Sequence, residues 1–428
     1  MNKKLIISWL QNLLLILLTA SALYLLSLIP GGSWTNRFQA FLTSRPQTVS
    51  QTQEANLRAA IPALHVMVTS DPEYGRFGSI NMSAQDQQVQ QLTPLLQDAL
   101  GSAVEIGPTD DAALHRALQT PGFLLDLTTE LPLSVISTWL EAELSLECPV
   151  RRIALTTEDS TNAALYLQAE DGTILRYGTA LSVSAVQELA GTFAPNGSRF
   201  AYESNYPTLA PYTFLITETP ALPQITAAVP AGFSADTLLS ALGFNVHNRY
   251  RYTESSGTEV IIESPRELRI DPNGMVSYTG DDTVTASLYR ISTAGDRPTA
   301  AEAVQGAVHL ASALTAGTGA SPLSLQCTEV TESGYTVFFR YHHSNYPVFA
   351  SYSGSIPSDG YALSVTVTGS VITSFTYHCR AYTSTGSASL LLPSAQAIAV
   401  ASIYPGAELM IGYTDHGQST LAADWQAG

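Results

Sequence analysis

The first hydrophobic pattern along the chain is an apolar run from Leu5 to Ile29, 25 residues without a formal charge. At about 1.5 Å per helical residue, such a run crosses a bilayer core of roughly 30 Å with some tilt. Lys3 and Lys4 precede the run, and the positive-inside bias puts this short N-terminus in the cytoplasm. We therefore predict a single-pass cell-membrane protein whose anchor lies within residues 1–30 and whose remainder is extracytoplasmic.

A cleaved signal peptide is the competing interpretation of this run. Ala20-Ser21-Ala22 has the small-x-small form of a cleavage site. The apolar residues continue from Leu23 to Ile29, whereas the apolar core of a signal peptide is about 7 to 15 residues long. The length of the run favours an uncleaved anchor.

Small and polar residues of the anchor gather on one side of the predicted helix. At 100° per residue, an arc of about 100° contains Ser8, Gln11, Asn12, Thr19 and Ala22. Such a face suits close packing and hydrogen bonding against a partner helix. The alternative is that Gln11 and Asn12 lie near the cytoplasmic interface, where water satisfies their amides.

The pattern beyond the anchor begins with a linker over residues 31–55, which is rich in Ser, Thr, Gln, Gly and Pro. Hydrophobic periodicity then predicts a first α+β domain over residues 56–217, with Asp171-Gly172 as a hairpin turn. The expected strands are 63–69, 123–127, 163–169 and 173–177. The expected helices are one capped by Ser83 and others at 111–118, 133–140 and 182–190.

Two helix-plus-meander modules are predicted next. Residues 218–295 begin with a proline-rich boundary and contain a short helix capped by Ser234, then strands at 246–253, 258–263, 267–270 and 276–278. Residues 296–428 begin with a helix whose N-terminus has a capping box formed by Thr299 and Glu302. Alternating strands follow, with a helix at 394–402 and a closing strand at 409–413. The predicted fold class is α+β: one transmembrane helix, then modules of helix and antiparallel sheet.

The charge balance narrows the range of partners. The net charge is −17, and because residues 1–30 carry +2, the remainder carries −19. An exterior this acidic excludes nucleic acid as a partner. It favours a basic protein partner or, more simply, solubility.

The three cysteines are too few for a disulfide scaffold. Cys148, Cys327 and Cys379 cannot all pair within one chain. Cys327 and Cys379 both fall in predicted strands of the last module, so one bridge between them is left open.

No residue pattern predicts catalysis or metal binding. His342 and His343 are adjacent on a predicted strand and point to opposite faces. The other candidates have simpler explanations as turns, helix caps or a solvated helix end, namely Asp110-Asp111, Asp281-Asp282, and Glu141 with Glu143 and Glu147. The sequence also lacks a Gly-x-Ser-x-Gly elbow, a phosphate loop and a dinucleotide fingerprint. We expect no catalytic residue, no metal and no cofactor.

The order of elements and several stretches of sequence resemble the YycH/YycI family, the extracytoplasmic regulators of the WalK (YycG) sensor histidine kinase in Gram-positive bacteria. The stretches are Tyr335–Tyr341, Asn345–Phe349, the strand pair Ala362–Thr368 and Val371–Tyr377, Ile411-Gly412-Tyr413 before Leu421 and Trp425, and Leu124–Leu133. The resemblance implies a non-enzymatic membrane regulator of a kinase that controls cell-wall metabolism. It also implies a sister bitopic regulator as a second partner, and it transfers no active site.

Two other function classes remain open. A binding or inhibitory module of the PepSY-like kind, active in germination or protease control, would use the same helix-on-sheet units. A wall-processing enzyme is the third class, and it would require one of the carboxylates to be essential for activity on peptidoglycan.

Overall fold

The computed structural model describes residues 56–71, 75–142, 147–206, 208–293, 295, 297–351 and 360–427. The predicted anchor, with Ser8, Gln11, Asn12, Thr19 and Ala22, and the predicted linker to residue 55 lie outside these ranges. Within them, no helix combines the length and apolar character needed to cross a bilayer. The described residues form an α+β fold, as predicted, and belong to one compact unit over Gln53–Gly428.

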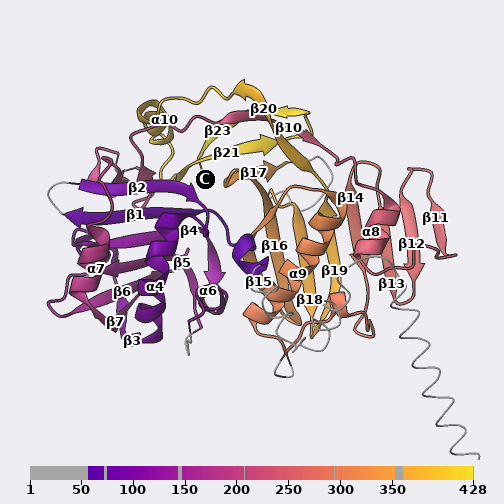
Figure 1. The fold of residues 1–428 in the computed structure, drawn as a ribbon, viewed down its shortest axis with the longest axis horizontal. Helices are drawn as coiled ribbons and strands as arrows, with labels where there is room; N and C mark the ends of the chain where they lie inside the picture. The colour runs from indigo at the N-terminus through magenta and orange to yellow at the C-terminus, as the bar shows by residue number, and fades with distance from the viewer. Residues whose placement is uncertain are drawn as a thin grey trace, which may run out of the picture. The chain divides into compact units, whose positions relative to one another are not determined.

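The first half contains an antiparallel seven-stranded sheet with strand order β2-β1-β4-β5-β6-β7-β3 (Figure 1). Its strands are β1 (Leu64–Asp71), β2 (Gly75–Met82), β3 (Val104–Thr109), β4 (Gly122–Pro132), β5 (Pro149–Thr156), β6 (Asn162–Gln168) and β7 (Ile174–Ser182). Its helices are α4 (Gln87–Gly101), α5 (Asp111–Ala117), α6 (Leu133–Leu140) and α7 (Val183–Ala190).

Helices cover both faces of this sheet. Leu125 belongs to the core under α4, α6 and α7, whereas Leu124, one residue earlier, packs with α5 and with residues 200–214. Successive side chains of a strand point to opposite faces, so a strand buried on both sides is nearly continuously apolar. This is why β4 begins with Phe123, Leu124 and Leu125.

Local signals placed most helices of this half correctly. The 133–140 helix is confirmed residue for residue as α6, and Ser182 caps α7 by accepting a hydrogen bond from the Ala185 amide. The predicted cap at Ser83 was wrong, because α4 begins at Gln87. Ser83 instead accepts from the Gln85 amide within a turn, and its own amide donates to the Asp86 carboxylate.

The second half contains an eleven-stranded sheet that is antiparallel except where β17 and β21 pair. The strand order is β11-β12-β13-β14-β19-β18-β16-β17-β21-β23, and β15 also pairs with β16. The first four strands are β11 (Arg251–Thr253), β12 (Glu259–Glu263), β13 (Arg266–Ile270) and β14 (Met275–Thr279). The others are β15 (Leu323–Thr331), β16 (Gly334–His343), β17 (Tyr346–Ala350), β18 (Leu363–Thr368), β19 (Val371–His378), β21 (Leu409–Asp415) and β23 (Ala423–Ala427).

Two helices pack with this sheet, α8 (Ala235–Ala241) and α9 (Ala300–Thr318). The predicted caps are confirmed: Ser234 caps α8, and Thr299 with Glu302 forms the capping box of α9. The sheet runs across the predicted boundary at residue 295, because β14 pairs with β19. The domain boundaries at 217 and 295 stay predictions.

The strand predicted at 246–253 was too long, because only Arg251–Thr253 is extended. Asn245 and Asn248 precede it, and each side-chain oxygen accepts a hydrogen bond from the backbone amide two residues later. Such local bonds compete with pairing in a sheet. The closing strand predicted at 409–413 forms as β21, but it is not the last strand of the sheet, because β23 pairs along its outer edge.

The bridge left open between Cys327 and Cys379 does not form, and all three cysteines are free thiols. Cys327 lies in β15 and Cys379 follows β19, with β16 and β18 between these strands. Neighbouring strands are about 4.8 Å apart, so three steps separate the two residues by roughly 14 Å. A disulfide requires Cα atoms within about 7 Å.

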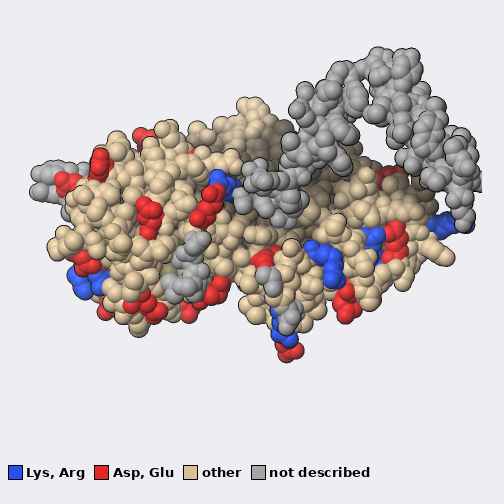
Figure 2. All heavy atoms as spheres, turned by 60° about the horizontal axis from the view of Figure 1, so that its bottom comes forward, with Lys and Arg blue, Asp and Glu red and all other residues tan. Residues whose placement is uncertain are grey.

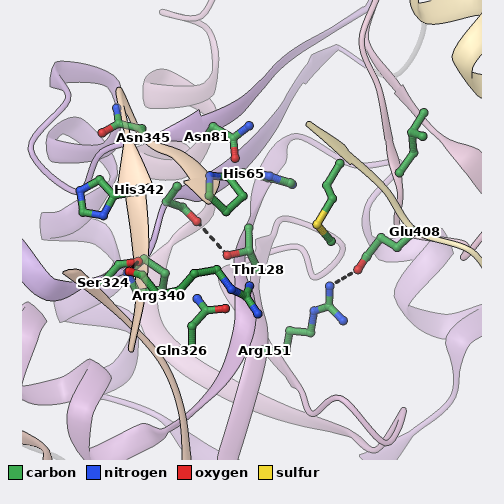
Figure 3. A pocket seen from close by; sticks show the side chains of 15 residues that line it. His65, Asn81, Thr128, Arg151, Ser324, Gln326, Arg340, His342, Asn345 and Glu408 are labelled. Atoms are coloured by element: carbon green, nitrogen blue, oxygen red, sulfur yellow. Dashed lines mark hydrogen bonds and ion pairs between the residues drawn. The ribbon is translucent and has the colours of Figure 1, made fainter. Parts of the chain in front are cut away.

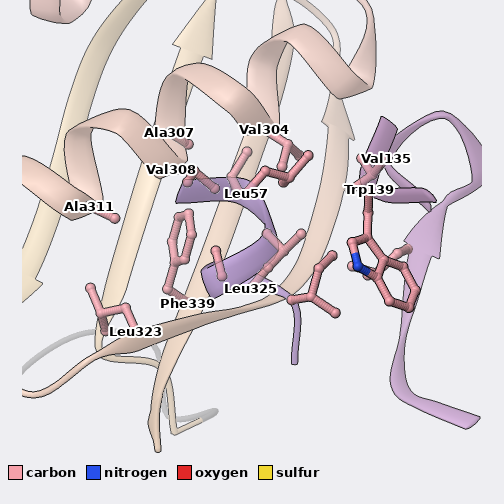
Figure 4. Close-up of a cluster of buried hydrophobic side chains, with 14 of the residues drawn as sticks. Leu57, Val135, Trp139, Val304, Ala307, Val308, Ala311, Leu323, Leu325 and Phe339 are labelled. Carbon is pink, nitrogen blue, oxygen red and sulfur yellow. The ribbon is translucent and has the colours of Figure 1, made fainter. Parts of the chain in front are cut away.

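The two halves share one hydrophobic core (Figure 4). Leu57, from a helical turn at residues 56–60, and Trp139 of α6 belong to the first half. Val304 of α9 and Phe339 of β16 belong to the second, and all four side chains are at most 4% exposed. The halves are therefore joined by apolar contacts in which the Leu57 turn and α6 pack with α9 and β16.

The segment between the halves is itself part of a sheet. β10 (Pro223–Ala228) lies between β20 (Ala381–Ala388) and β22 (Thr420–Leu421). A smaller core joins α10 (Ser394–Ala401) to the first half through Leu209 and Leu215. The remaining short elements are β8 (Arg199–Phe200), β9 (Phe214–Leu215), and the 3₁₀ turns η1 (Ala201–Glu203) and η2 (Ser287–Tyr289).

Leu57 lies in the core that both halves share, so we predict that it stabilises the whole described unit. Leu57→Ala should lower the free energy of unfolding by about 2–5 kcal/mol, because it opens a cavity where both halves meet. Denaturant unfolding of the full-length chain in detergent, followed by tryptophan fluorescence, measures this loss. Leu390→Ala is the matched control, since Leu390 is 96% exposed and its truncation should change stability by less than about 0.5 kcal/mol. Equal effects of the two changes would contradict the shared core.

Candidate functional site

A row of four polar side chains crosses one end of the seven-stranded sheet. The strand register places His65 opposite Asp126, Asp126 opposite Arg152, and Arg152 opposite Gln168. Residues directly opposite on neighbouring strands project from the same face. The row therefore runs across β1, β4, β5 and β6 on the face that elsewhere carries Leu124, and we call it the polar row.

The centre of the polar row is a buried ion pair. The Asp126 carboxylate is 2% exposed, and it accepts a 2.7 Å hydrogen bond from Arg152 Nε and another of 2.7 Å from the Thr128 amide. Burial acts to raise the pKa of Asp126, but the charges of Arg152 and Arg151 outweigh burial and lower this pKa to about 2. Asp126 is therefore ionised at neutral pH.

The second half of the chain completes this ionic cluster. Glu408, the residue before β21, pairs with both Arg151 and Arg152 of β5. Arg151 also lies 3.5 Å from the carboxylate of Glu170. Removing one partner from a buried ion pair costs about 3–5 kcal/mol because the other charge stays behind. The cluster thus links the halves electrostatically beside the shared core.

A pocket lies beside the polar row, between the two halves (Figure 3). Its polar lining residues are His65, Asn81, Thr128, Arg151, Ser324, Gln326, Arg340, His342, Asn345 and Glu408. The centre of a water molecule can occupy about 50 Å³ of it. At about 10–15 Å³ for each water, this is room for three to five waters or one small polar group.

Unusual backbone conformations gather around this pocket. Five described residues other than glycine have a positive φ, and three of them line the pocket: Asn81 (54°), Thr128 (60°) and Asn345 (67°). Asn81 and Thr128 lie at register shifts of β2 and β4, and Asn345 lies in the two-residue loop between β16 and β17. Positive φ is costly for such residues and concentrates at ligand sites. Two strands and one hairpin loop therefore change direction at the pocket.

His342 and His343 diverge, as predicted. His342 lines the pocket, and burial lowers the pKa of its imidazole to about 4. His343 instead contacts the Ser384 hydroxyl of β20 at 2.7 Å. No group of three or more His, Cys, Asp or Glu in the described ranges is placed to hold a metal ion.

The acidic candidates have the turn and cap roles that were expected. Asp110 caps α5 by accepting from the Ala113 amide, and Asp281 accepts from the Thr283 amide in a turn. Glu141 ends α6 and pairs with Arg58, and Glu147 accepts from the Ser134 hydroxyl. Asp111 accepts from the Tyr212 hydroxyl, Asp282 is exposed, and Glu143 lies outside the described residues.

The polar row and the pocket were missed at the level of sequence. Asp126 does interrupt an apolar run, Phe123–Leu127, and Arg151-Arg152 is a rare basic pair in this acidic chain. Only the strand register brings these residues together, and register is not visible in one sequence. On the face drawn in Figure 2, the described acidic residues are scattered and the described basic residues form no broad patch.

Comparison with known proteins gives a structural match. No protein-family model matches the sequence, and no curated protein matches it. The structure is similar to the crystal structure of YycH from Bacillus subtilis, with a TM-score of 0.51 and 11% sequence identity. The match covers 87% of this chain and 94% of that one. The resemblance inferred from the sequence is confirmed at the level of the fold, because the chain has a YycH-like fold.

The polar row predicts a pH dependence of stability. Because the pKa of Asp126 is lowered from its ordinary 3.8 to about 2, its stabilisation is present above pH 4 and is lost as the pH falls toward 2. This loss amounts to roughly 2 kcal/mol. Asp126→Asn should cost about 3 kcal/mol at pH 7 and flatten the decline between pH 4 and 2.

Urea unfolding at a series of pH values measures both effects. Asp282→Asn, on the exposed turn, is the matched control and should leave the profile unchanged. If the free energy of unfolding falls equally steeply between pH 4 and 2 in Asp126→Asn and in wild type, the polar row does not cause this pH dependence.

Proposed function

We propose that this chain is a membrane-anchored, extracytoplasmic regulator of a sensor histidine kinase and acts through protein contacts rather than catalysis. The observation that carries the proposal is the YycH-like fold over 87% of the chain. The kinase would be the WalK (YycG) type that controls cell-wall metabolism, as the family resemblance implies. A sister bitopic regulator would be the second partner.

The described side chains support a non-enzymatic role. In the ionic cluster around Asp126, the carboxylates of Asp126 and Glu408 are paired with Arg152. In a second buried pair, Asp415 is bound by Arg380 and also accepts a 2.9 Å hydrogen bond from the Tyr382 hydroxyl. A general acid or base needs a reachable proton and a pKa near the working pH. The groups in these two pairs serve folding contacts instead.

The predicted anchor supplies the first contact in this proposal. Its uncharged run would place the described unit outside the membrane, where the ectodomain of a sensor kinase lies. Gln11 and Asn12 would then face a helix of the kinase or of the sister regulator, because an amide facing lipid is costly. Interhelical hydrogen bonds of this kind contribute about 0.6–2 kcal/mol each.

Co-purification tests the proposal directly. The full-length chain, tagged at its C-terminus and extracted from membranes in mild detergent, should recover a sensor histidine kinase. The control is the same ectodomain carried by an unrelated transmembrane helix, which should recover less kinase. If neither protein recovers a kinase and deleting the chain leaves kinase output unchanged, the proposal is wrong.

Replacing the two anchor amides tests the helix contact. Gln11→Leu with Asn12→Leu should preserve insertion but reduce kinase recovery roughly eightfold, from about 0.6 kcal/mol for each lost bond. Leu13→Ala with Leu17→Ala, on another part of the helix surface, should leave recovery near wild type. Undiminished recovery by the Gln11/Asn12 double variant, with normal kinase output, would mean that the helix serves only as a tether.

A further inference from the structure

The pocket between the halves contains nitrogen atoms that lack a hydrogen-bond partner. Three buried atoms of this kind belong to lining residues: Asn81 Nδ2, Arg151 Nε and His342 Nδ1. The first two always carry a hydrogen, and the third does so in one tautomer of a neutral imidazole. A buried donor without a partner costs about 1–3 kcal/mol. The pocket therefore presents donors that require acceptors.

The surrounding structure holds the first of these donors in place. Asn81 is only 6% exposed and has a left-handed backbone conformation at the register shift between β1 and β2. His65, the first member of the polar row, lines the same pocket. The bulge and the burial hold the Asn81 amide at the pocket while its Nδ2 stays unbonded.

Of the other two donors, Arg151 is held by ion pairs and His342 is kept neutral by burial. Glu408 and Glu170 hold the Arg151 guanidinium, whose Nε lies 3.6 Å from an Asp126 oxygen, beyond hydrogen-bonding distance. Burial lowers the pKa of His342 to about 4, so its imidazole is neutral at pH 7 and has one N–H to donate. Arg151 cannot turn to solvent without breaking these ion pairs.

The charge around the pocket favours a negative acceptor. Arg340 also lines it, with its guanidinium carbon 4.5 Å from the ring centroid of Phe349 and 5.6 Å from that of Tyr361. The one carboxylate in the lining, Glu408, is already paired with Arg151 and Arg152. Two arginines and one carboxylate thus line the space, together with neutral donors, so its lining carries a net positive charge.

We propose that this pocket binds a carboxylate group, with Asn81 and Arg151 of the first half and Arg340 and His342 of the second as its ligands. A carboxylate is acceptor-only and has about four lone-pair sites, which matches several converging donors. The bound group would connect the two halves. Its source is either a free small carboxylate or a carboxylate presented by a partner protein.

Acetate is the probe for this site. Thermal unfolding of the full-length chain in detergent is compared in sodium acetate and in sodium chloride of equal ionic strength. Acetate that binds only the folded state should raise the midpoint by about 1–4 °C in a saturable way. Asn81→Asp should abolish this rise, because it replaces the donor with a negative oxygen at nearly constant size.

Two further variants make the comparison decisive. Asn205→Asp, on an exposed turn, introduces the same charge outside the pocket and should retain the full rise in acetate. His342→Leu, which removes a donor without adding charge, should weaken the rise, and it replaces Asn81→Asp if that variant does not fold. No acetate-specific rise in wild type, or an undiminished rise in both pocket variants, would show that the donors bind only water and would overturn the proposal.

Kinase recovery distinguishes the two sources of the carboxylate. If Asn81→Asp loses the acetate response and also recovers less kinase, the partner presents the carboxylate. If recovery is unchanged, a free carboxylate is the ligand. The acetate measurement involves no kinase, so its result stands whether or not the chain regulates one.

Discussion

Burial of apolar surface between the two halves is the interaction on which the rest of the described structure depends. Leu57 and Trp139 from the first half meet Val304 and Phe339 from the second in one continuous core. Everything polar between the halves is held at distances set by this contact. The Arg151–Glu408 pair and the contact of the Thr129 hydroxyl with the Gln326 carbonyl both join residues of different halves. The apolar core fixes the geometry of these contacts, and a buried ion pair offsets the desolvation of its charges only when its geometry is good.

The sequence predicted local structure well where one signal acted within a few residues. The capping box of Thr299 and the apolar period of α6 depend only on neighbours along the chain, and both elements form as expected. The errors arose from competing local bonds. The Asn245 and Asn248 side chains bond nearby amides and shorten a strand whose composition suits pairing.

The site could not be predicted because it depends on register and on contacts between distant segments. The polar row requires Asp126 to lie opposite both His65 and Arg152, and a shift of one residue would send Asp126 to the other face. The separation of Cys327 from Cys379 likewise follows from a strand order that no local pattern encodes. Asn345 carries a local signal that could have been used, since an Asn in a two-residue hairpin loop often has a positive φ.

The central position of β10 has a consequence for how the chain is made. Its two partners come late in the sequence: Thr226 bonds the carbonyl of Thr383, 157 residues further on, and the second partner, β22, ends at Leu421. As the ribosome extends the chain, β10 therefore waits with both hydrogen-bonding edges open until β20 has emerged, and with one edge open until Leu421 has emerged. Long-range pairing of this kind is slow and leaves strands exposed to aggregation. A nascent chain that stops short of residue 420 presents β10 with one unpaired edge, which any factor that binds open strand edges can recognise.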